Sequence, residues 1–464
     1  MTAGSVQSRD IVQTASAGGD YAAAPEGSHA LPSTERAWRT DATTLAHTEI
    51  HPSGSTLALA RSGAVYLAPA LASPHLGIAR SCDQGVSWDV LLPAARDVEP
   101  PTWTRPHLYV DRGTDRVFLL TPARATSGTT EPGQHSLDLR ISADGGTTWE
   151  HAAVTDGAHA WGPLCAGPAA SSGPHTYPHT LYVIGSTRGD RADSHTVYRS
   201  RDGGLSFEPT AALTLDAAAL GDAGDPAPSR VEGCVVLPEG SLVVAARIGA
   251  RLGIAVSRDE GESFSVTPVA GASLADPWPM LRARSRASLD AAPREMLACD
   301  ATGCTYIVWV GRDRRAQMSI SWDGARTFST PLVVSAPDVR EVRGVSVAAR
   351  DAGHVVVAYS GSRDGRTFHG YVAESRRALA PQPRFHRVPV KALGSPLFTA
   401  DAGEHDLGRA ILDPRARVQV RCGANGEIWV HFVKDAIEGS LARDGGAATP
   451  HRLLGVAACI PPER

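Results

Sequence analysis

The chain of 464 residues contains only two lysines, Lys391 and Lys434, and a single asparagine, Asn425. Arginine therefore supplies almost all of the positive charge, which we interpret as the codon bias of a GC-rich genome. The formal net charge is −4, with both signs mixed along the sequence. This balance indicates neither a nucleic-acid partner nor binding to an anionic membrane surface.

Long apolar runs and several familiar motifs are also missing. No run of about 18 apolar residues occurs, so no membrane-spanning helix is expected. The sequence has no phosphate-binding glycine loop, no G-x-S-x-G elbow and no His-Glu-x-x-His motif. No C-x-x-C or Cys/His spacing typical of zinc is present. We therefore predict no metal site and no cofactor.

The seven cysteines form no clear pattern, and their odd number leaves at least one thiol free. Cys299 and Cys304 flank the turn at 300–303, where a disulfide across a hairpin is one expectation. Buried free thiols are the alternative, and the spacing does not decide between the two. Cys165 and Cys234 occupy similar places in neighbouring repeats of the pattern described next.

An eight-residue pattern, S-x-D-x-G-x-[ST]-[WF], occurs five times, with Ala325 in place of one glycine. The pattern is typical of a turn, because an Asp carboxylate accepts hydrogen bonds from N–H groups two or more residues further on. Its glycine supplies a positive φ at no steric cost, and its aromatic residue begins the next strand. The copies are Ser81–Trp88, Ser142–Trp149, Ser200–Phe207, Ser257–Phe264 and Ser321–Phe328.

The aspartates of successive copies are 57 to 64 residues apart. This period is long for a solenoid repeat and fits one four-stranded propeller blade with long loops. At the same pace, two further copies fall near 380 and 440. Residues 442–448, around Asp444, form a degenerate copy, whereas residues 375–377 have lost both the aspartate and the glycine. We predict seven blades, with six as the alternative.

The five copies resemble the Asp-box, or BNR repeat, of the sialidase-like β-propellers. The resemblance implies an all-β propeller of four-stranded antiparallel blades joined by Asp-box turns. A residue that recurs in every blade cannot mark a single site, so we interpret the repeated aspartates as structural. They are Asp83, Asp144, Asp202, Asp259 and Asp323.

Two regions are expected: a flexible leader over residues 1–40, and one propeller domain over residues 41–464. The first 40 residues are rich in Ala, Gly and Ser and show no periodicity. Met1 is not followed by a basic and then an apolar segment, so no signal peptide is visible. Either the protein stays inside the cell or the chain starts after a removed signal. The resemblance favours an extracellular or periplasmic location, and we expect a monomer.

Short runs of Val, Leu and Ile that end at Gly and Asp turns predict the inner hairpin of each blade. The first of these hairpins is predicted to pair residues 48–51 with residues 56–60. We expect the apolar runs to form the core between neighbouring blades rather than a ligand groove.

Propellers concentrate function in the loops that lead into their innermost strands. In this chain those segments are richer in Arg, acids, His and Trp than the strands themselves. Arginine pairs bidentately with carboxylates, so converging arginines would hold an acidic sugar or another carboxylate ligand. The predicted ligand-binding residues are Trp103, Arg105, His107, Trp161, Arg230, Trp278 and Arg343.

The resemblance also implies what a catalytic member of the family would need: three arginines on a carboxylate, a Tyr–Glu nucleophile pair and an Asp acid/base. Arg105, Arg230 and Arg343 are candidates for the arginines. The candidate acids are Glu232, Glu341 and Asp276. No tyrosine stands at a mouth position of the predicted strands. We therefore favour a propeller that binds a carbohydrate or protein ligand at the channel mouth without catalysis. A sialidase-type glycoside hydrolase is the alternative.

Overall fold

The structure is a computed structural model of the chain. It describes residues 56–68, 78–91, 106–124, 135–155, 162–170, 175–187, 194–213, 215, 229–248, 250–274, 295–390, 396–399, 417–435 and 453–460, and the backbone of 12–14 and 43–45. Within this part there is no helix, and so none that is long and apolar enough to cross a membrane.

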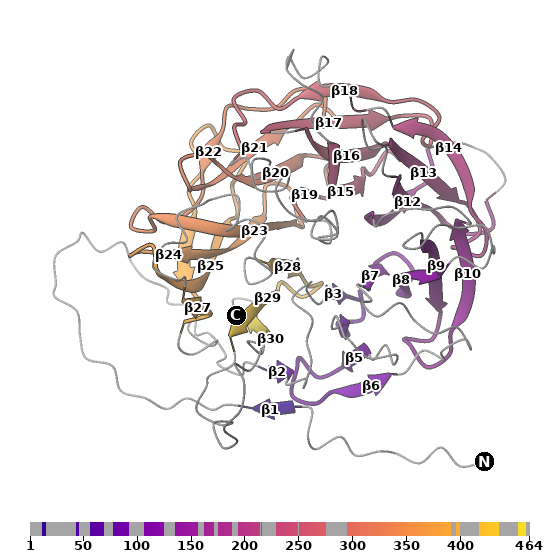
Figure 1. The fold of residues 1–464 in the computed structure, drawn as a ribbon, viewed down its shortest axis with the longest axis horizontal. Helices are drawn as coiled ribbons and strands as arrows, with labels where there is room; N and C mark the ends of the chain where they lie inside the picture. The colour runs from indigo at the N-terminus through magenta and orange to yellow at the C-terminus, as the bar shows by residue number, and fades with distance from the viewer. Residues whose placement is uncertain are drawn as a thin grey trace.

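Seven antiparallel sheets stand in a ring around a central axis, so the chain folds as an all-β, seven-bladed β-propeller (Figure 1). The predicted fold class and blade number are confirmed, and the alternative of six blades is wrong. Blades 1 to 3 are β3 (Thr56–Leu59), β4 (Val65–Ala68), β5 (Ile78–Ser81) and β6 (Asp89–Leu91); β7 (His107–Asp111), β8 (Arg116–Arg124), β9 (His135–Ser142) and β10 (Glu150–Thr155); β11 (Leu164–Pro168), β12 (His179–Thr187), β13 (Ser194–Ser200) and β14 (Glu208–Leu213).

The next three blades follow the same plan, with each blade's first strand innermost. Blades 4 to 6 are β15 (Ser229–Val236), β16 (Leu242–Ile248), β17 (Arg251–Ser257) and β18 (Ser265–Pro268); β19 (Leu297–Cys299), β20 (Thr305–Val310), β21 (Ala316–Ser321) and β22 (Leu332–Val333); β23 (Glu341–Ala349), β24 (Val355–Ser362), β25 (Thr367–Ser375) and β26 (His386–Pro389), with β27 (Phe398–Thr399) paired to β25.

Blade 7 combines the first two and the last three strands of the described chain. It consists of β28 (Val418–Cys422), β29 (Ile428–Asp435) and β30 (Leu453–Ile460), followed by β2 (Thr43–Leu45) and β1 (Val12–Thr14). The ring is thus closed by an early strand, β2, that pairs with the last strand of the chain (Figure 1). The predicted leader, residues 1–40, lies outside the described residues apart from the backbone of β1.

One predicted hairpin is shifted by a strand. Residues 56–60 were expected to form the second strand of blade 1, but β3 is its innermost strand and pairs with β4. The predicted partner, residues 48–51, lies outside the described residues. The shift follows from the ring closure, because β2 completes blade 7 and the chain enters blade 1 only afterwards.

The core consists of one apolar cluster at each of the seven blade interfaces, as the sequence predicts. The cluster between blades 7 and 1, for example, packs Leu57 and Val65 against Trp429. All three side chains are at most 2% exposed. Successive side chains of a strand point to opposite faces of the sheet. Each blade therefore packs one face into the cluster with the preceding blade and the other face into the cluster with the next blade.

The five sequence repeats all form the turn between the third and fourth strands of a blade. In each turn the first serine donates to the aspartate Oδ1 at 2.8 Å. In blade 2, Asp144 also accepts hydrogen bonds from the backbone N–H and the hydroxyl of Thr148. These bonds lower the pKa of the Asp144 carboxyl to about 2, the Thr148 hydroxyl making the largest contribution. The carboxylate thereby closes its own turn.

The same turns also join neighbouring blades. At four consecutive interfaces an arginine donates to the carbonyl of the residue that follows the turn aspartate in the next blade. The pairs are Arg80 with Gly145 (2.9 Å), Arg116 with Gly203 (3.2 Å), Arg199 with Glu260 (3.0 Å) and Arg258 with Gly324 (3.3 Å). The repeat therefore supplies an acceptor for the preceding blade as well as a turn.

Blades 6 and 7 depart from this plan. In blade 6 a similar turn, in which Ser362 donates to Asp364 at 2.8 Å, joins the second and third strands instead. The degenerate copy around Asp444 lies outside the described residues and, in the chain, falls between the second and third strands of blade 7.

The expected disulfide between Cys299 and Cys304 is absent, and all seven cysteines are free. The register of the hairpin explains this result. Cys299 pairs with Thr305, so Cys304 falls within the turn rather than opposite Cys299.

Candidate functional site

The two ends of the central channel are distinct. Because neighbouring strands are antiparallel, every inner strand begins at one end, and its hairpin with the second strand lies at the other. We call these ends the entry mouth and the hairpin mouth. The five repeated turns lie on the side of the hairpin mouth, whereas the sequence predicts the site at the entry mouth.

The structure describes five of the predicted site residues. They are His107, Arg230, Glu232, Glu341 and Arg343. The other five, Trp103, Arg105, Trp161, Asp276 and Trp278, lie outside the described residues.

In blade 6, Glu341 is held between two arginines at the entry mouth. Its Oε1 accepts from Arg343 Nε at 3.0 Å, and its Oε2 accepts from Arg314 Nη1 at 2.9 Å. The guanidinium of Arg343 is buried and stacks over Phe368, with its Cζ 4.4 Å from the ring centroid. Arg343 is therefore part of the packed blade, whereas Arg314 is 34% exposed.

In blade 4, Arg230 and Glu232 form a looser pair, with Arg230 Nε 3.8 Å from Glu232 Oε1. The side chain of Arg230 is 24% exposed and that of Glu232 only 3%. The second carboxylate oxygen, Oε2, is buried without a hydrogen-bond partner among the described residues. A hydrogen-bond donor on a ligand would satisfy this buried oxygen.

Two of these residues occupy β-bulges. The register of β15 with β16 shifts between Val231 and Gly233, so Glu232 is the extra residue. The register of β23 with β24 shifts between Val342 and Gly344, so Arg343 is the extra residue there. A bulge re-aims the side chain of its extra residue and is common beside active sites.

His107 lies in the channel itself. It is 8% exposed, and burial lowers its pKa to about 4, while Glu295 opposes that shift. Glu295 forms an ion pair with Arg421 of β28. These three residues come from blades 2, 5 and 7, so they bring together segments that are far apart in the sequence.

Hydrogen bonds extend from the Glu295–Arg421 pair to blades 6 and 1. The carbonyl of Glu295 accepts from the N–H of Val347, and its Oε1 accepts from Gln419 Nε2 at 3.2 Å. Gln419 Oε1 in turn accepts from the N–H of Leu57 at 2.7 Å. This polar chain links the inner strands across the point where the ring closes.

A cavity of about 890 Å³ occupies the channel from this pair to the hairpin mouth. All seven inner strands line it, mostly with apolar side chains. Three arginines of the inner hairpins, Arg61, Arg112 and Arg350, stand at its rim. The sequence analysis considered only the entry mouth and so missed them. Their shared position, one or two residues after an inner strand in three blades, is the signal that was available.

Four cysteines also line the cavity. Burial raises the pKa of Cys299 and of Cys422 to about 12. Cys165 is shifted upward too, first by burial and then by its contact with Cys234. Cys165, Cys299 and Cys422 are therefore protonated at neutral pH. In the described part of the chain, no group of three or more His, Cys, Asp or Glu residues is arranged to hold a metal ion.

Comparisons with known proteins show resemblance at low identity. No family model matches the chain, and no curated protein matches it. The NanB sialidase from Streptococcus pneumoniae is 14% identical over 88% of this chain and 68% of its own, with a TM-score of 0.42. A protein of unknown function from Dyadobacter fermentans is 11% identical over 87% and 93%, with a TM-score of 0.39.

A third solved structure also resembles the chain. A mutant of AofleA from Arthrobotrys oligospora is 12% identical over 75% of this chain and 92% of its own, with a TM-score of 0.44. Scores and identities in this range carry no argument about ligand or activity.

Proposed function

We propose that the protein is a propeller of the Asp-box type that binds a glycan with an anionic group at the entry mouth, without catalysing its hydrolysis. The observation that carries this proposal is the state of Glu341. Both of its carboxylate oxygens are held by arginines, at 2.9 and 3.0 Å. A catalytic carboxylate needs a free oxygen near the reacting atom or near the group that it activates.

Arg230 is the group best suited to hold the ligand. Its side chain is 24% exposed at the entry mouth, beside Glu232. A ligand carboxylate can therefore approach its guanidinium. Arg343 is not accessible in this way, because it is 1% exposed and stacked on Phe368.

The test is a glycan-array binding screen, run beside hydrolysis of a panel of fluorogenic glycosides. We expect retention of acidic glycans, no turnover of any glycoside, and weaker binding by Arg230→Ala at an unchanged melting temperature. Arg251→Ala, an exposed arginine at the start of β17, is the matched control. Absence of any glycan binding, or equal loss in the control, contradicts the proposal.

A glycoside hydrolase remains a second candidate because of one observation. Glu232 Oε2 is buried and has no partner among the described residues, so it is available to a substrate hydroxyl. The same glycoside panel decides. Turnover that is lost in Glu232→Gln, with the fold intact, would replace the binding proposal by this one.

A further inference from the structure

The channel cavity has the size of a small-molecule site and a different chemistry from the entry mouth. Its volume of about 890 Å³ lies within the range of ligand pockets, roughly 300–1,000 Å³. The residues that line it include Leu59, Val110, Leu164 and Val236, and most of its lining surface is apolar. Tyr109 also lines it, and its hydroxyl donates to the carbonyl of Ala166. The walls therefore favour an apolar ligand body over a sugar.

The rim of the cavity is divided into two arcs. Blades 6, 1 and 2 contribute the arginines Arg350, Arg61 and Arg112, and blades 3, 4 and 5 contribute Pro168, Pro238 and Ala301. A ligand that enters at the hairpin mouth thus meets cationic groups on one side and an apolar surface on the other.

The charges that line the cavity are mainly positive. The lining residues include four arginines and two carboxylates, whereas the whole chain has a formal charge of −4. One carboxylate, Asp111, already accepts hydrogen bonds from Tyr177 and lies 2.7 Å from His179 Nδ1. The other, Glu295, is paired with Arg421. The excess positive charge therefore resides at the rim.

The rim arginines are available to a ligand. Within the described part of the chain, the exposed guanidinium groups of Arg61 and Arg112 have no acidic partner, and Arg350 has one contact, 3.4 Å from the exposed Asp351. Arg112 and Arg350 both act on the thiol of Cys422, where their positive charges oppose the effect of burial on its pKa. Both guanidinium groups therefore act electrostatically on the same part of the channel lining.

We propose that the channel is a second binding site, open at the hairpin mouth, for a small amphipathic anion such as an aromatic or alkyl carboxylate. The anionic head lies against the arginines of blades 1, 2 and 6, where a low-dielectric wall strengthens the attraction. The apolar body lies along the inner strands, and its burial contributes roughly 25 cal/mol per Å². This site is independent of the glycan site at the opposite mouth.

Two dyes of nearly the same shape test the proposal: 8-anilinonaphthalene-1-sulfonate, which is anionic, and N-phenyl-1-naphthylamine, which is neutral. The folded protein should bind the anionic dye at least about tenfold more tightly, as one ion-pair contact warrants. Arg112→Gln combined with Arg350→Gln should remove most of this difference and leave binding of the neutral dye unchanged. Arg251→Gln is the matched control, and near-UV circular dichroism verifies that each variant is folded.

Blocking the mouth separates the channel from any other dye site. Ala301→Trp adds bulk at an exposed rim position and should weaken binding of both dyes. Failure of either dye to bind would overturn the proposal. So would anionic-dye binding that is unchanged both in Ala301→Trp and in the double arginine variant, because the dye would then be elsewhere. Equal affinity for the two dyes would refute the role of the arginines.

Discussion

Glu295, which precedes the inner strand of blade 5, forms an ion pair with Arg421 on the inner strand of blade 7. The two side chains are 16% and 26% exposed, so the pair is partly shielded from water. It connects blades that are not adjacent in the ring, and through Gln419 it reaches blade 1. We infer that this pair stabilises ring closure more than an ordinary surface ion pair would.

A double-mutant cycle tests that inference. Glu295→Gln and Arg421→Gln should each destabilise the protein, because each leaves an uncompensated charge on the channel wall. The coupling free energy should be about 1–2 kcal/mol, above the typical value for exposed pairs. Urea denaturation of the four proteins gives the number. Additive effects of the two substitutions would show that the pair is incidental.

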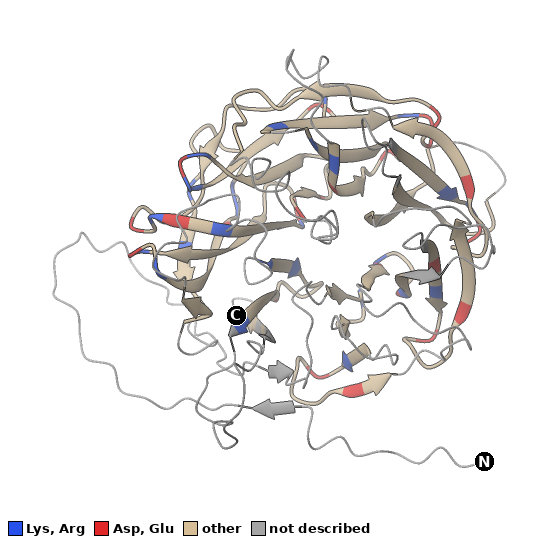
Figure 2. Cartoon of the chain, viewed as in Figure 1, with Lys and Arg blue, Asp and Glu red and all other residues tan. Residues whose placement is uncertain are grey.

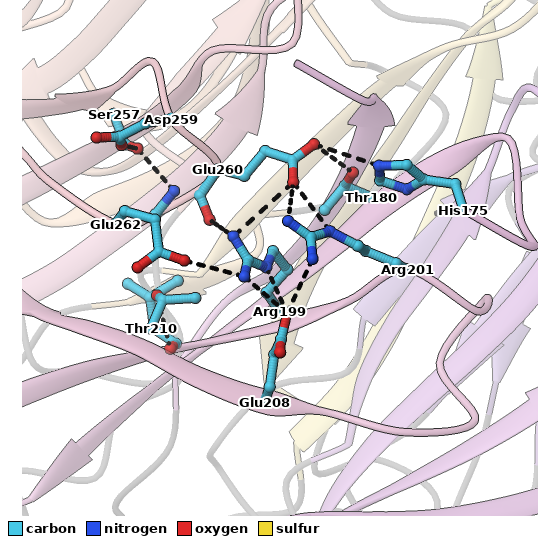
Figure 3. A network of polar contacts seen from close by, with 12 residues as sticks. His175, Thr180, Arg199, Arg201, Glu208, Thr210, Ser257, Asp259, Glu260 and Glu262 are labelled. Carbon is cyan, nitrogen blue, oxygen red and sulfur yellow. Dashed lines mark hydrogen bonds and ion pairs between the residues drawn. The ribbon is translucent and has the colours of Figure 1, made fainter. Parts of the chain in front are cut away.

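Glu260 illustrates a second relationship between blades. Its backbone has a φ of 56° at a turn position where Gly145, Gly203 and Gly324 stand in other blades. Figure 3 shows why a glutamate occupies this place: its carboxylate is surrounded by Arg199, Arg201 and His175 of blade 3. Arg201 Nη2 lies 2.7 Å from its Oε2, and the glutamate is 1% exposed.

Replacing Glu260 by glycine should therefore destabilise the protein, although it relieves the positive φ. Loss of one partner of a buried ion pair costs about 3–5 kcal/mol, and relief of a left-handed residue returns about 1–2. Gln84 has φ 60° at the same position of blade 1 and an exposed side chain. Gln84→Gly is thus the matched control: it gains the same backbone relief, less the roughly 0.5–1 kcal/mol of extra backbone entropy that glycine loses on folding, so it should leave the protein equally stable or slightly more stable. If urea denaturation showed the same effect for Glu260→Gly and Gln84→Gly, the ion pairs of Glu260 would not contribute to stability.

Acid should weaken the fold through histidines that are buried in their neutral form. Burial lowers the pKa of His107, His195 and His431 from 6.5 to about 4. Below pH 6.5 these histidines become protonated in the unfolded chain, whereas in the folded chain they remain neutral down to about pH 4. Stability should therefore fall as the pH decreases through this window, by up to about 1.4 kcal/mol per pH unit for each histidine.

His195 is the best of the three to test, because its ring nitrogens lie 2.7 Å from Ser186 Oγ and 2.9 Å from Ser229 Oγ. Glutamine retains hydrogen-bonding capacity at this place without titrating. His195→Gln should reduce the difference between urea midpoints at pH 7 and pH 5. The exposed His386 in β26 is the control, and His386→Gln should leave that difference unchanged. An unchanged difference in His195→Gln would assign the acid sensitivity to other groups.

The sequence predicts the ring well because most blades are built from strands that are neighbours in the sequence. Each blade is a run of neighbouring strands with its own turn signals, and the repeat around Asp144 or Asp202 marks the same connection each time. Ring closure escaped prediction because β2 is only three residues long and pairs with β30, about 410 residues away. Its hydrogen bonds depend on tertiary structure, which a three-residue segment cannot indicate.

The candidate site was only partly predictable for a similar reason. Glu341 and Arg343 are two residues apart, so their pairing follows from a single bulge. The meeting of Glu295 with Arg421 depends on the diameter of the ring and on side-chain reach. Charged residues of both signs are spread around the ring, and positive colour on β28 is seen near its centre (Figure 2). Composition alone does not reveal that position.

The last prediction separates structural arginines from arginines available to ligand. Arg343 is 1% exposed, pairs with Glu341 and stacks over Phe368, whereas Arg230 is 24% exposed. Arg343→Met should lower the free energy of unfolding by about 3 kcal/mol or more, because it leaves Glu341 with one partner and removes the stacking. Arg230→Met should change it by less than about 1 kcal/mol, as exposed arginines do. Thermal and urea unfolding measure both. A stable Arg343→Met protein that has lost glycan binding would instead place Arg343 in the ligand site, and equal destabilisation by the two substitutions would place Arg230 among the structural residues.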